Sequence, residues 1–302
     1  MARVAAKDPG SPRPVVKWAG GKSALAPRLL AHFPRKIGTY VEPFCGGAAV
    51  FFALAAEPRR RFAHAVLTDQ NEDLIALYRA LQTDVATLAG RLAELADRHL
   101  ALDDAARERH YYEVREATPP QGDLVARAAR LVFLNKTCFN GLWRVNASGR
   151  NNVPFGRYTR PKIYDPDALR AASRALAGVE LHVADFEAVT APLRKGDFVY
   201  FDPPYVPLSR TASFTAYAAG GFGPDDQRRL VATLGRLRDR DVRAILSNAC
   251  SPDTRALYEG FHQDVVPMRR SINSDVKKRG LVDELVVSTH ELRARSDDRA
   301  AS

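Results

Sequence analysis

Short apolar runs alternate with amphipathic stretches over most of the chain. A run of roughly four to eight apolar residues indicates a buried strand, and apolar residues three and four positions apart indicate a helix. The expected strands are the start of Thr39–Phe52, then Ala65–Asp69, Val179–Asp185, the run from Phe198, Val242–Ser247 and Asp283–His290. The expected helices are Ser23–His32, the stripe over Asp73–Leu100, Ala126–Phe133, Pro224–Asp239 and Pro252–Glu259. This order predicts an alternating α/β sheet.

The alternation is interrupted in the middle of the chain. Helical stripes there are followed by Asn135–Arg157, which is rich in Asn, Gly, Arg and aromatic residues, and the turn Ala147–Gly149 within it predicts a β-hairpin. We therefore expect a discontinuous domain over residues 15–72 and 163–292, with a second domain inserted over 73–162. Flexible tails are expected over 1–14 and 293–302.

Composition narrows the class of protein. The chain has 302 residues, of which 46% are hydrophobic, and no apolar run is long enough for a membrane span. Residues 1–14 lack the apolar core of a signal peptide, so we expect a cytoplasmic protein. Cys45, Cys138 and Cys250 form no metal-ligand or disulfide pattern and are expected to be small buried residues. A balance of 45 Lys and Arg against 35 Asp and Glu, a net charge of +10, favours a polyanionic partner.

The stretch Phe198–Tyr205 predicts a binding site. Its apolar half ends in Asp202-Pro-Pro-Tyr205, at the carboxyl end of a strand, where open α/β sheets place their ligands. Prolines stiffen this loop and lack N–H groups, so Asp202 and bare carbonyls face a ligand as hydrogen-bond acceptors. Together with the ring of Tyr205, they suit a planar ligand that carries an amino group. A plain turn is the alternative interpretation.

Two glycine loops suggest a second ligand. Val15–Ser23 ends like a phosphate-binding P-loop, but Val16 stands where that motif needs a glycine, so we reject a nucleoside triphosphatase. What remains is a glycine pair between Trp18 and Lys22, or simply a turn before a helix. The strand, glycine loop and helix of Thr39–Phe52 have the order that adenosine cofactors use.

Two later strand ends add carboxylates to this prediction. Asp69 follows the glycine loop at the distance expected of a ribose-binding acid. Asp185 ends another apolar run and is placed to reach the adenine of such a cofactor. For either residue, the alternative is an N-cap of the next helix.

Basic and aromatic residues in the middle of the chain suggest contact with nucleic acid. The expected hairpin carries Arg144, Arg150 and Arg157 beside Phe139 and Trp143, which are the residue types that read grooves and stack on bases. A polar surface hairpin with buried aromatics is the alternative. The basic stretch Arg269–Arg279 is expected to contact phosphates, and Ser209–Phe222 to close over a substrate.

Several motifs occur in an order that resembles the Dam-type DNA adenine-N6 methyltransferases. They are Lys17-Trp-Ala-Gly-Gly-Lys22, Glu42-Pro-Phe-Cys-Gly-Gly47, Asn140-Gly-Leu-Trp-Arg144, Asn152-Val-Pro-Phe-Gly156, Asp202-Pro-Pro-Tyr205 and Arg269-Arg-Ser-Ile272. The resemblance runs from about Val15 to His290. It implies a Rossmann-like methyltransferase sheet with an inserted helical and β-hairpin DNA-recognition domain. It also implies S-adenosylmethionine as methyl donor, double-stranded DNA as partner and GATC as the target.

The resemblance assigns roles residue by residue. Asp202, Pro203 and Tyr205 would be catalytic. The cofactor site would contain Trp18, Lys22, Asp69 and Asp202, to which the loop and strand ends add Phe44, Gly46, Asp185 and Phe186. The DNA contacts would be Lys17, Phe139, Asn140, Leu142, Arg144 and Pro154, with Arg157, Arg269 and Arg270 completing the basic set. No metal is expected.

The sequence departs from the family pattern at two positions and leaves some readings open. Ala48 stands where the loop often has a glycine, and Arg150 replaces a commonly acidic residue, which makes the recognised DNA sequence less certain. A cytosine-N4 methyltransferase usually has Ser in place of Asp202, and a silent DNA-binding module would not need the intact loops. A partner restriction endonuclease, a replication and repair role and a phage role all stay open.

Overall fold

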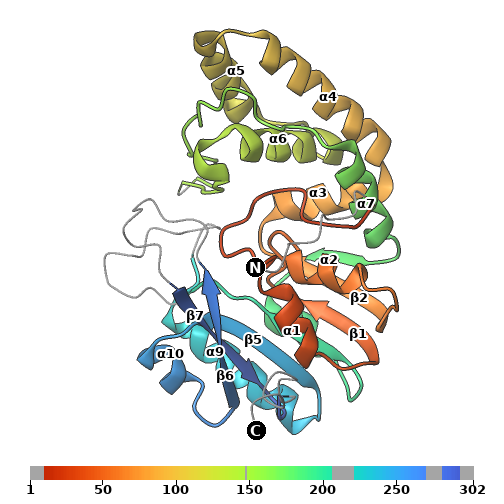
Figure 1. Cartoon of the computed structure of the whole chain (residues 1–302), viewed down its shortest axis with the longest axis vertical. Helices are drawn as coiled ribbons and strands as arrows, with labels where there is room; N and C mark the ends of the chain where they lie inside the picture. Colours follow the sequence, from red (N-terminus) through yellow and green to blue (C-terminus); the bar gives the residue numbers. More distant parts are fainter. Residues whose placement is uncertain (1–9, 147, 206–220, 270–280, 293–302) are drawn as a thin grey trace, which may run out of the picture.

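The computed structural model describes residues 10–146, 148–205, 221–269 and 281–292. Within these ranges seven strands form one sheet in the order β3-β2-β1-β4-β5-β7-β6 (Figure 1). The strands are β1 Ile37–Glu42, β2 Phe62–Asp69, β3 Glu180–Val183, β4 Phe198–Phe201, β5 Arg243–Ala249, β6 His262–Arg269 and β7 Leu281–Ser288. The first five strands pair in parallel, whereas β7 runs antiparallel to both β5 and β6.

Helices cover both faces of the parallel strands, which explains why these strands are nearly continuous apolar runs. On one face Tyr40, Phe198 and Tyr200 pack with the helices α1 Ala26–His32, α2 Ala49–Ala55 and α3 Glu72–Thr83. On the other face Val41, Val199 and Phe201 pack with α8 Phe186–Thr190 and α9 Pro224–Asp239, and α10 Pro252–Leu257 lies near the sheet edge. The order of strands reverses between β1 and β4, and this is the position at which open α/β sheets bind ligands.

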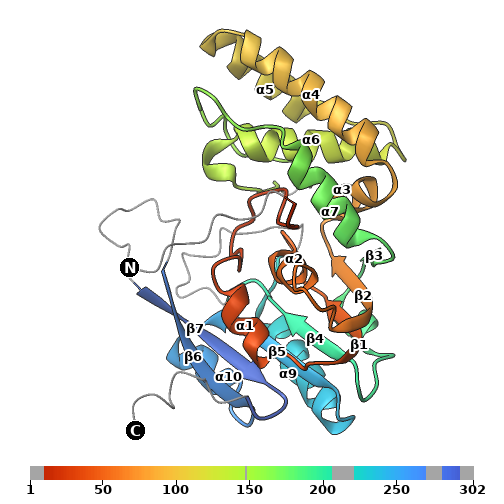
Figure 2. The same cartoon turned by 45° about the vertical axis from the view of Figure 1, so that its right-hand side comes forward.

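A lobe of helices stands above the sheet. It contains α4 Val85–Ala101, α5 Asp104–Glu116 and α6 Leu124–Thr137, and α7 Pro166–Leu176 leads back to the sheet (Figures 1 and 2). Between α6 and α7 the chain makes the isolated antiparallel bridges Cys138 to Phe155 and Val145 to Asn151. A helical region therefore follows β2 in the chain, where the sequence pattern places it. The domain boundaries at 73 and 162 stay a prediction.

Some predicted elements need correction. The single helical stripe over Asp73–Leu100 is two helices, because Asp84 leaves helical geometry (φ −152°, ψ 60°) and its side chain accepts a hydrogen bond from Thr87 N to cap α4. The sequence analysis did not predict β6, α5, α7 or α8. The final strand begins at Leu281, two residues before the predicted start.

Other expectations can be compared only in part. Cys45 and Cys138 are buried, and Cys250 is partly exposed. In the described ranges no helix is long and apolar enough to cross a membrane. Of the predicted flexible tail 1–14, residues 1–9 lie outside the described ranges, and Arg13 forms an ion pair with Asp165 at 3.1 Å.

Candidate active site

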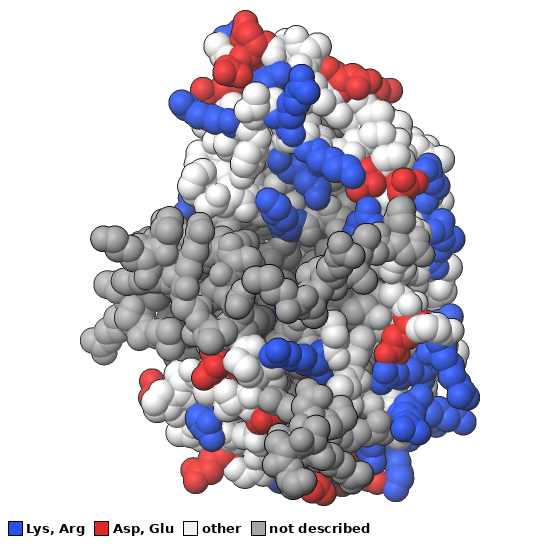
Figure 3. Space-filling view, in the orientation of Figure 1, with Lys and Arg blue, Asp and Glu red and all other residues white. Residues whose placement is uncertain are grey.

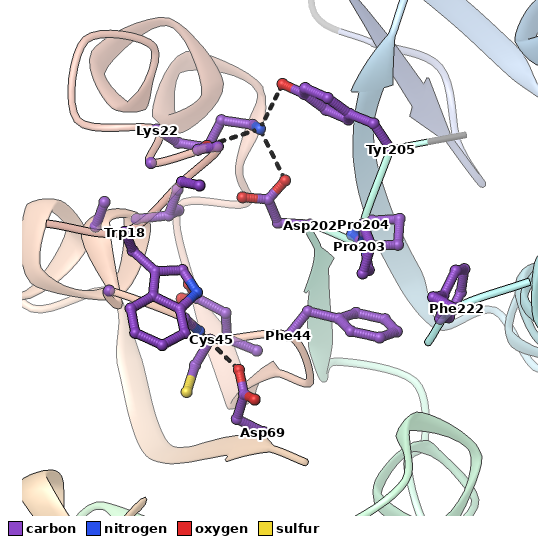
Figure 4. A pocket seen from close by; sticks show the side chains of 18 of the residues that line it. Trp18, Lys22, Phe44, Cys45, Asp69, Asp202, Pro203, Pro204, Tyr205 and Phe222 are labelled. Atoms are coloured by element: carbon purple, nitrogen blue, oxygen red, sulfur yellow. Dashed lines mark hydrogen bonds and ion pairs between the residues drawn. The ribbon is translucent and has the colours of Figure 1, made fainter. Parts of the chain in front are cut away.

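One cavity lies at the carboxyl ends of β1, β2 and β4 (Figure 4). Five separate segments line it: residues 18–22, the end of β1 with the loop and first turn of α2 that follow it, the end of β2, the loop after β4, and residues 221–222 before α9. Among the predicted site residues, the lining contains Trp18, Lys22, Phe44, Gly46, Asp69, Asp202, Pro203 and Tyr205. Glu42, Cys45 and Phe222 also line it. The structure thus brings together residues that the sequence analysis assigned from widely separated motifs.

The glycine loop after β1 packs tightly against Trp18. Gly46 has a φ of +46°, and a Cβ at this position would lie 2.6 Å from Cδ1 of Trp18, so the indole ring needs glycine here. Ala48 also adopts a left-handed conformation, with φ +52°. The departure from glycine at Ala48 therefore places a side chain in a backbone conformation that glycine adopts more readily.

Asp69 holds the glycine loop to the end of β2. Its carboxylate accepts hydrogen bonds from Gly46 N at 3.0 Å and from Asn71 N at 2.9 Å. Burial raises the pKa of Asp69 to about 6, although these backbone N–H groups act in the opposite direction. A carboxylate has about four acceptor sites in all, so Asp69 keeps capacity for a ligand.

Lys22 connects the segment before α1 to the loop after β4. Its ammonium group forms an ion pair with Asp202 Oδ1 at 2.8 Å and donates to Tyr205 Oη at 3.0 Å and Gly20 O at 3.0 Å (Figure 4). Burial alone would lower the pKa of Lys22, but the neighbouring Asp202 and Glu284 raise it above its ordinary value. Lys22 is therefore a buried cation whose hydrogen bonds fix the orientation of the Asp202 loop.

The sequence analysis missed Glu284. This residue lies on β7, is 1% exposed, and forms an ion pair with Lys22 at 3.1 Å. Its carboxylate also accepts a hydrogen bond from Tyr205 Oη at 2.9 Å. An acidic residue inside the apolar strand Leu281–Ser288 is the signal that could have identified it, because a buried carboxylate needs a partner.

Glu42 is a second buried carboxylate that was quoted in a motif but assigned no role. It lies at the end of β1, 2% exposed, and accepts a hydrogen bond from Tyr40 Oη at 2.6 Å. Burial raises the pKa of Glu42 to about 8, while the bond from Tyr40 lowers it. Burial therefore disfavours the charged form of Glu42 at the end of β1.

Asp185 and Phe186 lie beside the cavity and do not line it. Asp185 caps α8 by accepting from Glu187 N at 2.9 Å, which is the alternative role that the sequence allowed, and it pairs with Arg229 at 2.8 Å. The ring of Phe186 packs 5.5 Å from that of Phe44, and Phe222 meets Phe44 edge to face at 5.4 Å. These contacts build an apolar wall behind Phe44, and a contact of Asp185 with a cofactor stays a prediction.

The Asn135–Arg157 segment presents several predicted DNA-binding side chains on its surface. Phe139 is 49% exposed, which is unusual for a large aromatic residue, and Arg144, Pro154 and Arg157 are also exposed. Arg144 donates through Nε to Asn152 Oδ1 at 2.7 Å. Trp143 is instead buried and stacks 6.5 Å from Trp18.

The remaining predicted contacts differ in exposure. Asn140 and Leu142 are half-buried, Asn140 has a φ of +57°, and Lys17, directly before Trp18, is exposed. Figure 3 shows Lys and Arg side chains spread over this face of the helical lobe. Arg269 ends β6, whereas Arg270, the rest of the basic loop and most of Ser209–Phe222 lie outside the described ranges.

Asn135 joins this segment to the cavity. Its side chain is 1% exposed, accepts from Lys17 N at 2.8 Å and donates to Lys17 O at 2.8 Å and Gly141 O at 3.0 Å. The sequence analysis assigned Asn135 no role. The residue therefore connects Lys17, next to Trp18 of the cavity, with the turn that carries Phe139.

Comparison with known proteins decides the family. The model of the D12 class N6 adenine-specific DNA methyltransferases matches residues 18–272. The chain belongs to this family. It is 40% identical over 287 residues to the type II methyltransferase M.MjaIII of Methanocaldococcus jannaschii, covering 91% of this chain and 99% of that protein. It is also 34% identical over 276 residues to the DNA adenine methylase of Escherichia coli K12, covering 91% and 94%.

Family membership establishes several of the expectations. The chain is a site-specific adenine DNA methyltransferase, S-adenosylmethionine is the methyl donor of its family, and the sheet is a Rossmann-like methyltransferase sheet. The matching family model is adenine-specific, which argues against the cytosine-N4 alternative. The similarity to a protein named a methyltransferase argues against a DNA-binding module without activity.

Asn135 provides a test of how this D12-class chain is assembled. Asn135→Ala should lower the free energy of unfolding by about 1–3 kcal/mol, because the Lys17 and Gly141 backbone groups lose their partners. Urea denaturation measures the change. Gln121→Ala, at an exposed turn residue, is the control and should leave the midpoint unchanged. Equal midpoints for the two variants would show that the Asn135 contacts do not hold these segments together.

Proposed function

We propose that this chain methylates N6 of adenine within GATC sites of duplex DNA. The observation that carries the proposal is the Asp202-Pro-Pro-Tyr205 loop on the wall of the cavity, with Asp202 held at one carboxylate oxygen by Lys22. The GATC assignment is supported by the Dam-type residues of the Asn135–Arg157 segment and by relatives that are named DNA adenine methylases.

The amino group of adenine is a weak nucleophile because its lone pair is delocalised into the ring. Asp202 Oδ1 contacts Lys22 and Ser247 Oγ, at 2.8 and 3.4 Å, while Oδ2 makes no hydrogen bond in the described part of the chain. We assign Oδ2 and the Pro203 carbonyl as acceptors for the two N6 hydrogens. Two fixed acceptors orient the nitrogen lone pair and stabilise the positive charge that develops on N6 during the reaction.

The cofactor residues fit S-adenosylmethionine at the other end of the cavity. When bound, this cofactor supplies an electrophilic methyl group attached to sulfur. Asp69 is positioned at a strand end with acceptor sites left for ribose hydroxyls, and Trp18 and Phe44 offer apolar ring surface beside Gly46. The ammonium group of Lys22 lies at the other end of the cavity, where it contacts Asp202 and Tyr205.

The target base must leave the duplex to reach Asp202. Extrusion of a base costs a few kcal/mol. We assign Tyr205 to stack on the extruded adenine, which contributes ~1–3 kcal/mol. The hydroxyl group of Tyr205 is bonded to both Lys22 and Glu284, so the ring is held in place before the base arrives.

We assign sequence reading to the inserted region 73–162 and its exposed hairpin side chains. Asn152 occupies Nε of Arg144, so the two terminal amino groups of its guanidinium stay available for the O6 and N7 atoms of a guanine. Phe139, exposed and next to the left-handed residue Asn140, would stack into the space that the adenine leaves. Pro154 would contact a thymine methyl group, and the basic Lys17, Arg157, Arg269 and Arg270 would contact the DNA around the site.

The cellular setting is also a proposal. The relatives named type II methyltransferases support a partner restriction endonuclease that acts on the same DNA sequence. An enzyme with this substrate would work in the cytoplasm, associated with the nucleoid.

Asp202→Ala tests the catalytic assignment. Turnover should fall by roughly 100-fold or more, because N6 loses its charged acceptor while the Pro203 carbonyl stays. The measurement is transfer of a radiolabelled methyl group to a GATC duplex at saturating cofactor. Asp225→Ala, at a surface carboxylate that is 89% exposed, is the matched control and should keep the wild-type rate. A near wild-type rate in Asp202→Ala would refute the mechanism.

Arg144→Ala tests the proposed reader. The variant should lose discrimination worth ~1–3 kcal/mol against duplexes altered at one guanine of GATC, with less effect on duplexes altered elsewhere. Values of kcat/KM on a panel of single-base variants provide the measurement. Arg98→Ala is the control, because Arg98 is exposed on α4, outside the Asn135–Arg157 segment, and should leave the preference profile unchanged. An unaltered preference profile in Arg144→Ala would exclude the hairpin as the guanine reader.

A further inference from the structure

Glu284 has appeared so far only as a partner of the Tyr205 hydroxyl group, although it is buried against both Lys22 and Tyr205. It lies on the antiparallel strand β7, between Ala249 of β5 and Val266 of β6, and its side chain reaches across to Lys22 and Tyr205. Glu284 and Lys22 are each 1% exposed. Burying a carboxylate this deeply is costly unless it is paired and hydrogen-bonded, so its position calls for an explanation.

We propose that Glu284 is a positioning residue for methyl transfer, which shares Lys22 with Asp202 and holds the hydroxyl group of Tyr205. The inference rests on the proposed function of the Asp202 loop. Glu284 acts through its neighbours, because no substrate atom needs to touch it.

Lys22 has more acceptor atoms around it than it has protons. An ammonium group has three protons. Four acceptor atoms surround Lys22 Nζ: Asp202 Oδ1 at 2.8 Å, Gly20 O at 3.0 Å, Tyr205 Oη at 3.0 Å and Glu284 Oε1 at 3.1 Å. Glu284 therefore competes with Asp202 for the protons of Lys22. This competition limits how strongly Lys22 withdraws electron density from the Asp202 carboxylate, which we assign to accept a hydrogen bond from N6.

The charges of Lys22 and its two carboxylate partners do not cancel. One ammonium group is sufficient to neutralise one carboxylate, yet Lys22 contacts both Asp202 and Glu284. With both carboxylates ionised, the cluster carries one surplus negative charge at the end of the cavity assigned to the base. Positive charge moves toward N6 as the methyl group is transferred, and a fixed negative charge nearby stabilises that change.

Glu284 also restrains the ring of Tyr205. Its hydroxyl group donates to Glu284 Oε2 at 2.9 Å and accepts from Lys22 Nζ at 3.0 Å. These two bonds restrain the ring at its far end, while Pro204 stiffens the backbone that precedes it. Without Glu284 the hydroxyl group would be bonded to Lys22 alone of these two residues. The position of the ring on which the adenine stacks would then be less restricted.

Glu284→Gln is the main test, because glutamine has nearly the same shape and no charge. We expect kcat to fall roughly 10- to 100-fold, since a small misplacement of reacting groups can cost about 100-fold. The affinity for S-adenosylmethionine, measured by calorimetry without DNA, should be unchanged. Asp283→Asn removes one charge from the preceding, exposed residue of the same strand. This matched control should keep the wild-type kcat and cofactor affinity.

The pH profile separates positioning from mere structural support. Neighbouring Asp202 contributes to raising the pKa of Glu284, after the larger effect of burial. Because this repulsion between like charges is mutual, the loss of Glu284 should make Asp202 easier to ionise. The low-pH side of the pH profile of kcat, its acid limb, should therefore move to lower pH. A variant that is only less stable would lose activity without moving this limb. Glu284→Asp, which keeps the charge, should restore part of kcat and leave the limb in place.

The outcomes are distinguishable. Wild-type kcat in Glu284→Gln, or a lowered kcat with an unmoved acid limb, would overturn the inference. If thermal melting shows that Glu284→Gln does not fold, Glu284→Asp decides: lowered kcat with intact cofactor binding supports the proposal, and wild-type kcat overturns it. Asp202→Ala is assayed alongside. An active Asp202→Ala would refute the proposed function itself, whereas an inactive Asp202→Ala with a fully active Glu284→Gln would refute the role of Glu284 alone.

Discussion

The buried ammonium group of Lys22 is the interaction on which the site depends. It lies where three distant parts of the chain meet: the glycine pair before α1, the loop after β4, and the antiparallel strand β7. A lysine that is 1% exposed keeps its charge only with anionic partners, and Asp202 and Glu284 provide them. These carboxylates in turn need Lys22, and the three residues therefore order one another.

The sheet explains why these parts meet. Reversal of strand order between β1 and β4 opens a crevice at their carboxyl ends, and the glycine loop, Asp69 and Asp202 all follow strands that end there. The antiparallel strand β7 adds a residue from the opposite chain direction, since Glu284 is four residues into that strand. Asn135 and the stacked rings of Trp18 and Trp143 then connect the cavity to the hairpin segment. The parts of the chain that we propose for the cofactor, the base and the DNA thus share a continuous set of contacts.

Local sequence predicted the parts of this arrangement that depend on local rules. Apolar runs located most of the strands, and the Asp202 loop could be recognised because an acid, two prolines and a tyrosine follow a buried strand directly. Contacts between segments that are distant in the sequence could not be predicted from local patterns. Glu284 acquires its partners only when β7 lies beside β5, and the break at Asp84 replaces one periodic stripe by two helices. Asp185 illustrates a true ambiguity, because one residue pattern fits both a ligand carboxylate and the helix cap that the structure contains.

A double-mutant cycle on Lys22 and Glu284 tests the central claim most directly. The free energy of unfolding is measured for the wild type, Lys22→Met, Glu284→Gln and the double variant. Lys22→Met leaves two buried carboxylates facing each other without a cation, so adding Glu284→Gln should recover part of the lost stability. We predict a coupling energy of about 0.5–3 kcal/mol, the range found for residues in one charge network. Strictly additive effects would contradict the account, because they would mean that the two residues contribute to the fold independently.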